Sequence, residues 1–65
     1  MAKYGVGARV KATRPLNWGI KAGQVGIVRD VLHVNSDGVQ MYGVHFEGSA
    51  PSAVDDIPET ALASA

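Results

Sequence analysis

Residues 23–47 read GQVGIVRDVLHV (23–34), NSDG (35–38) and VQMYGVHFE (39–47). Two runs rich in β-branched and aromatic residues flank a cluster of turn formers, in which Asp37-Gly38 can supply the positive φ of a tight turn. This pattern predicts a β-hairpin. Because an isolated hairpin is only marginally stable, we expect it to belong to a small antiparallel sheet that curls to bury a core.

The apolar positions of the first run change parity along the chain. They are odd at Val25 and Ile27, and even at Val28, Leu32 and Val34. A one-residue slip turns side chains to the opposite face of a sheet, so we expect a β-bulge near residues 29–30. In the second run Tyr42, Val44 and Phe46 share one face, while the other face has Met41, Gly43, His45 and Glu47.

Shorter elements flank the hairpin. Residues 8–12 alternate small or apolar side chains with basic ones, which predicts a first strand. Residues 14–23 form a long loop, since Pro15 lacks a ladder donor and glycines follow it. A brief fourth strand is expected at residues 53–54, and a single 3₁₀ or α turn within residues 55–62.

These elements predict an all-β fold, a small SH3-like barrel of about five short antiparallel strands with one 3₁₀ turn near the C-terminus. One domain is expected to span residues 1–65, with residues 1–6 and 63–65 frayed. The expected core comprises Val10, Val25, Ile27, Tyr42, Val44, Phe46 and Leu62.

Composition narrows the environment of the chain. There is no cysteine among the 65 residues, which favours a reducing compartment. The first residues contain no apolar run, and no stretch approaches the length of a membrane span. We therefore expect a soluble cytoplasmic protein without a membrane partner.

The formal net charge is zero, but all six basic residues precede all six acidic ones in the sequence. Two interpretations follow from this layout. The basic half can form a binding face. Alternatively, the barrel brings the two halves together and the charges pair across strands.

Few residues suggest chemistry. His33 and His45, with Asp30 and Glu47 close in sequence, are the only group with metal-binding side chains, and they lack a dense ligand set. The serines fall in turns, where capping explains them, and the glycines precede a strand rather than a helix N-terminus. We expect no enzymatic activity, no bound metal and no cofactor.

The loop of residues 14–22 is the candidate binding element. Trp18 is either an exposed anchor for a partner or a cap over the open end of the barrel with Leu16 and Ile20. If Trp18 is an exposed anchor, we expect the protein to dock onto a larger protein. The predicted contact residues are Arg14, Asn17, Trp18 and Lys21 of the loop, together with Met41 and His45 of the third strand. The alternative partner is nucleic acid, bound through a stripe of Arg9, Lys11 and Arg14.

Three segments together resemble NifZ-type domains, which assist nitrogenase maturation: YGVGARVK (4–11), GQVGIVRDV (23–31) and YGVHF (42–46). A terminal IPETAL element (57–62) is similar to the end of such barrels. The chain also resembles the variable chain of ferredoxin–thioredoxin reductase and the photosystem I subunit PsaE. The resemblance implies an SH3-like accessory protein that docks onto a redox or metallocluster assembly and has no catalytic residues of its own.

One fragment points to an enzyme instead. The sequence VQMY (39–42) is similar to the VQIY of plasmid-type dihydrofolate reductases, which are oligomeric SH3-like barrels. In that family the motif precedes a proline near the terminal turn, whereas here it lies mid-chain before Gly43. A subunit of such an enzyme is the third functional alternative.

Overall fold

The computed structural model describes residues 2–16, 19–48 and 54–65. Its elements in chain order are β1 (Arg9–Ala12), β2 (Val25–Val34), β3 (Gln40–Phe46), β4 (Val54–Pro58), the 3₁₀ helix η1 (Glu59–Ala61) and β5 (Leu62–Ser64). The strands form one antiparallel sheet in the order β4-β3-β2-β1-β5. Over the described ranges, this confirms the all-β class, the five antiparallel strands and the 3₁₀ turn near the C-terminus.

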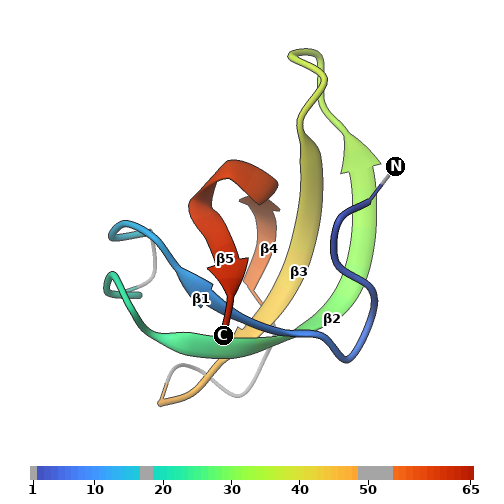
Figure 1. Cartoon of the computed structure of the whole chain (residues 1–65). Coiled ribbons are helices and arrows are strands. Elements are labelled where there is room, and N and C mark those ends of the chain that lie inside the picture. Colours follow the sequence, from blue (N-terminus) through green and yellow to red (C-terminus); the bar gives the residue numbers. More distant parts are fainter. Residues whose placement is uncertain (1, 17–18, 49–53) are drawn as a thin grey trace.

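The hairpin of β2 and β3 is the largest feature of the fold. Both strands curve strongly, and their turn projects beyond the rest of the molecule (Figure 1). The predicted turn chemistry is confirmed: Gly38 has a φ of 80°, and its N–H donates to Asn35 O at 3.0 Å. Asn35 Oδ1 accepts from the N–H groups of Asp37 and Val39, so one side chain organises the whole turn.

The predicted β-bulge is also confirmed. Val28 lies opposite Val44, and the next pair is Asp30 with Gly43, so β2 has one extra residue at this point. A bulge increases local twist and bends the strand. It lies where β2 leaves its partner β1 and continues only with β3.

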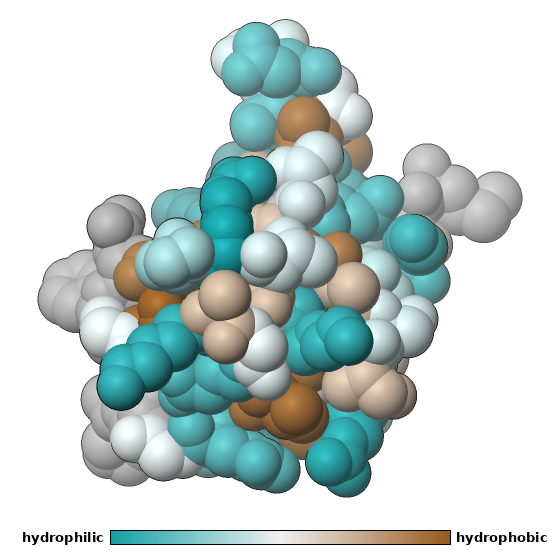
Figure 2. Space-filling view, turned by 60° about the vertical axis from the view of Figure 1, so that its left-hand side comes forward, coloured by the Kyte–Doolittle hydropathy of each residue, from teal (hydrophilic) through white to brown (hydrophobic). Residues whose placement is uncertain are grey.

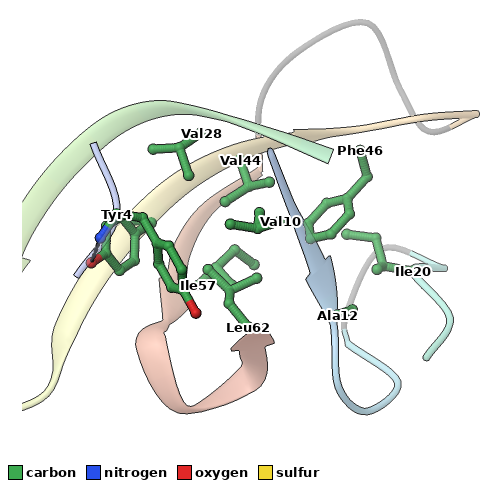
Figure 3. Packing of buried hydrophobic residues seen from close by; sticks show 10 residues of the cluster. Tyr4, Val10, Ala12, Ile20, Val28, Val44, Phe46, Ile57 and Leu62 are labelled. Atoms are coloured by element: carbon green, nitrogen blue, oxygen red, sulfur yellow. Dashed lines mark hydrogen bonds between the residues drawn. The ribbon is translucent and has the colours of Figure 1, made fainter. Parts of the chain in front are cut away.

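Ten buried side chains form the core under the curved sheet, and Figure 3 shows them converging from all five strands and two loops: Tyr4, Val10, Ala12, Ile20, Val28, Tyr42, Val44, Phe46, Ile57 and Leu62. The predicted inward face of β3 is confirmed, since Tyr42, Val44 and Phe46 are fully buried. Val10 and Leu62, which were also predicted as core residues, are buried in the structure.

Two predicted core residues are wrong. Ile27 is 36% exposed and Val25 is only half-buried, because the inward positions at the start of β2 are the even ones, Gly26 and Val28. A Cβ atom on Gly26 would lie 2.8 Å from His45 O, so β2 passes too close to β3 for any side chain here. Since a glycine carries no hydropathy signal, the apolar pattern indicated the opposite face.

The ends of the chain differ from expectation as well. Residues 63–65 were expected to be frayed, but Ala63 and Ser64 belong to β5, which pairs along β1. Tyr4, in the expected loose leader, is 7% exposed and belongs to the core. Asp55 and Asp56, expected in the terminal turn, lie in β4, and η1 begins only after Pro58.

Candidate functional site

The predicted binding loop is anchored at its base. Leu16 N–H donates to Ile20 O at 2.9 Å, and Gly23 N–H donates to Ala12 O at 2.7 Å. Ile20 is 2% exposed, and Leu16 packs against the core. Of the predicted contact residues, Arg14 and Lys21 are exposed at the two ends of this loop, whereas Asn17 and Trp18 lie outside the described residues.

The outer face of β1, β2 and β3 brings other predicted residues together. Arg9 lies opposite Ile27 in the β1–β2 pair, and Ile27 lies opposite His45 in the β2–β3 pair. Directly opposed side chains project from the same face of a sheet. Arg9, Ile27 and His45 therefore form a row across three strands, which we call the outer row.

A second pair extends this row. Lys11 lies opposite Val25 in the β1–β2 ladder, two residues along from Arg9 and Ile27. Alternate residues of a strand share a face, so Lys11 and Val25 lie beside the outer row. Ile27 and half-buried Val25 thus form an apolar centre between two exposed cations of β1 and the half-buried imidazole of His45.

Sequence reasoning predicted His45, Arg9 and Lys11 but assigned Ile27 to the core. The available signal was the basic alternation of β1, which fixes Arg9 as outward-facing. Pairing Arg9 with Ile27 requires the register of two strands, and that register is a tertiary property.

Figure 2 shows hydrophobic atoms as small, separate areas in a mainly hydrophilic surface.

Acidic side chains gather at a different part of the sheet. Gly43 lies opposite Asp30, and a Cβ atom built on Gly43 would be 2.8 Å from Asp55 Oδ1 and 3.6 Å from Asp30 Oδ2. The missing side chain of Gly43 makes room for these two carboxylates. Over the described ranges no ion pair joins the basic and acidic residues, so the expected pairing of charges across strands is not observed.

The remaining predicted residues lie apart from the outer row. Met41 is half-buried opposite Pro58 of β4, and its sulfur accepts a weak hydrogen bond from Asn35 Nδ2 at 3.6 Å. His33 is exposed near the hairpin turn, distant along β2 from the pairing position of His45. Within residues 2–16, 19–48 and 54–65, no group of three or more His, Cys, Asp or Glu side chains is placed to hold a metal ion.

A polar cluster joins the N-terminal segment to β3 and η1. The Tyr42 hydroxyl donates to Glu59 Oε2 at 2.5 Å and accepts from the backbone N–H groups of Lys3 and Tyr4 at 3.0 and 3.1 Å. Burial raises the pKa of Tyr42, and the hydrogen bond to Glu59 acts in the same direction. The same hydrogen bond lowers the pKa of Glu59. This arrangement keeps Tyr42 protonated, so it fastens the N-terminal segment rather than acting as a base.

The VQMY fragment is likewise used within the fold. Gln40 Nε2 donates to Leu32 O at 2.8 Å and to Met41 O at 3.1 Å, and Tyr42 is fully buried. The Gln40 amide nitrogen and the Tyr42 side chain are thus engaged within the fold.

Comparison with known proteins adds no assignment. No protein-family model matches the chain, and no curated protein or solved structure shows a significant match. No helix in the part of the chain that the structure describes is long and apolar enough to cross a membrane. The outer row is consequently the site with the strongest physical case, because it combines exposed apolar area with unpaired positive charge.

Proposed function

We propose that this protein is a non-catalytic docking module with an SH3-like barrel fold, which binds a larger protein through the outer row and the adjacent loop. The strand order β4-β3-β2-β1-β5, with η1 between β4 and β5, supports the SH3-like assignment. A rigid sheet suits docking, since its side chains are already ordered before the partner arrives.

The exposure of Ile27 carries the proposal. This β-branched residue has inward-facing neighbours at Gly26 and Val28, and it lies in the middle of a rigid sheet with Arg9 and His45 on either side. An apolar centre with a polar rim is the usual composition of a protein interface. The cations of the rim select a partner with an acidic surface.

Nucleic acid is the second candidate, because Arg9 and Lys11 project side by side from β1 and Arg14 follows at its end. The same surface has features that favour protein. Its centre is aliphatic, formed by Ile27 and Val25, and the outer row has no Phe, Tyr or Trp side chain on which a base can stack. Glu47, whose N–H donates to Val25 O, adds an acidic residue beside the strand that carries the apolar centre.

The resemblance to NifZ-type proteins directs the search for partners to redox and metallocluster assemblies in the cytoplasm. In the same proposal, Arg14, Asn17, Trp18 and Lys21 extend the contact from the loop, whereas Met41 lies apart from the outer row and is left out of the contact. The dihydrofolate reductase alternative is tested separately by incubating the protein with dihydrofolate and NADPH and measuring turnover.

The decisive experiment is affinity capture from native lysate at low and high salt with three variants. Ile27→Glu places a charge at the centre of the outer row, and Val6→Glu places the same charge at a site that is 70% exposed elsewhere. We expect Ile27→Glu to lose one specific protein that the wild type and Val6→Glu retain. Trp18→Ala tests the loop in the same assay.

A labelled oligonucleotide distinguishes the second candidate. Phosphate binding weakens steeply with salt and depends on Arg9 and Lys11 rather than on Ile27. If Arg9→Ala with Lys11→Ala abolishes salt-sensitive binding of the oligonucleotide, and Ile27→Glu captures the same proteins as the wild type, the protein-docking proposal is wrong.

A further inference from the structure

The turn of the β2–β3 hairpin contains the only Asp-Gly step of the chain, Asp37-Gly38. Both residues are exposed, and the turn projects beyond the rest of the molecule in Figure 1. Because glycine has no Cβ, nothing shields its backbone nitrogen from the side chain of the preceding residue. The Asp37 carboxyl carbon and the Gly38 nitrogen can therefore react with each other when the backbone allows them to meet.

This reaction needs water alone. The Gly38 nitrogen attacks Cγ of Asp37, an N–Cγ bond forms, and the amide proton leaves with the carboxyl hydroxyl as one molecule of water. The product is a five-membered succinimide ring. Water then opens the ring. Opening at Cγ restores aspartate, whereas opening at the main-chain carbonyl carbon of Asp37 produces isoaspartate, whose backbone runs through Cβ and Cγ.

The folded turn opposes the first step. The attacking nitrogen must lose its proton, but Gly38 N–H donates to Asn35 O at 3.0 Å. The Asn35 side chain holds the backbone on both sides of the step, since its Oδ1 accepts from Asp37 N–H at 2.9 Å and from Val39 N–H at 3.0 Å. Asn35 N–H also donates to Val39 O at 2.9 Å. Ring closure must therefore wait for local opening of the turn.

We propose that Asp37 is a site of spontaneous isomerisation to isoaspartate, and that the hydrogen bonds of Asn35 set the rate. Isoaspartate adds one carbon atom to the backbone between Asp37 Cα and Gly38 N. This changes the spacing by which Asn35 binds both Asp37 and Val39, so the modified turn does not close in the same way. The product therefore remains as a record that the turn has opened. The inference is independent of the outer row and of the proposed function.

Peptide mapping by mass spectrometry measures the reaction in the whole protein at neutral pH and physiological temperature. Arg29 is the last basic residue of the chain, so trypsin releases residues 30–65 as one peptide. Its isoaspartate form has the same mass and resists an Asp-specific protease at residue 37. The folded wild type should isomerise at least about tenfold more slowly than the same chain in denaturing urea, because the closed turn excludes the reactive conformations.

Asn35→Ala tests the role of the side chain. It removes the acceptor of two hydrogen bonds and should raise the rate in the folded protein about tenfold. Ser36→Ala is the matched control within the same turn, since the Ser36 side chain makes no hydrogen bond in the described ranges, and it should react at the wild-type rate. Far-UV circular dichroism checks that both variants are folded.

Three results would overturn the inference. The first is a chain that forms no isoaspartate at residue 37 in urea. The second is a wild type that reacts equally fast with and without urea. The third is a folded Asn35→Ala variant that reacts no faster than the wild type and Ser36→Ala.

Discussion

The two tyrosine hydroxyl groups in the core should have opposite effects on stability. Tyr42 Oη has three hydrogen-bond partners, whereas Tyr4 Oη is buried with no partner in the described residues. The rings lie 5.7 Å apart in the same cluster. Replacing either tyrosine with phenylalanine therefore removes one hydroxyl from the same surroundings and preserves the ring packing.

Tyr42→Phe should lower the free energy of unfolding by about 2–3 kcal/mol. It leaves the buried Tyr4 N–H without an acceptor and removes a donor from the Glu59 carboxylate, and an unsatisfied buried group costs about 1–3 kcal/mol. Glu59 is half-buried, so water can replace part of its lost bond. Tyr4→Phe removes an unpaired polar atom from the core and should be neutral or stabilising by up to about 1 kcal/mol.

Urea unfolding followed by far-UV circular dichroism measures both changes. For a domain of this size a slope of about 1 kcal/mol/M converts the Tyr42→Phe loss into a fall in midpoint of about 2–3 M. Such a loss is a large share of the roughly 5–15 kcal/mol by which typical domains are stable. The reasoning is refuted if Tyr42→Phe unfolds at the wild-type midpoint, or if Tyr4→Phe is the more destabilising of the two.

Three further predictions follow from packing and titration. Gly26→Ala should cost about 1–3 kcal/mol, since its Cβ would lie 2.8 Å from the backbone oxygen of His45, and thermal unfolding measures the loss. Phe46→Ala should cost about 3–5 kcal/mol in urea unfolding, whereas Ile27→Ala, on the outer face, should cost far less. The pKa of Glu59 is lower in the folded state than its ordinary value of 4.5. The stability that Glu59 contributes should therefore be full above pH 4.5 and decline as the pH falls through the folded pKa. This decline in the free energy of unfolding should be weaker in Glu59→Gln, and equal pH slopes in the two proteins would contradict the lowered pKa of Glu59.

Local sequence determined the hairpin and the β-bulge in β2. The turn depends on Gly38, which adopts a positive φ, and on Asn35, whose side chain bonds within four residues. The bulge was visible as a change of apolar parity because side chains alternate strictly along a strand. The inward face of β3 was predictable for the same reason, since Tyr42, Val44 and Phe46 alternate with Gly43 and His45.

Other features depend on contacts between distant residues. The inward face at the start of β2 is marked by Gly26, whose missing side chain matters only because β3 crosses it closely. The N-terminal segment is ordered by Tyr42 and Glu59, which are 38 to 56 residues away from the backbone groups they bind. The strand β5 exists because β1 offers it an unpaired edge, and its own three residues carry little strand signal.

The candidate site was likewise predictable from the sequence only in part. The basic alternation of β1 and the outward position of His45 were legible in the sequence, because each depends on the period of a single strand. Arg9 and His45 lie on either side of Ile27 because of the registers of β1 with β2 and of β2 with β3. Register is set by the combined burial and hydrogen bonding of paired strands, so a pattern within one strand determines which residues face outward, and only the folded sheet determines which of them become neighbours.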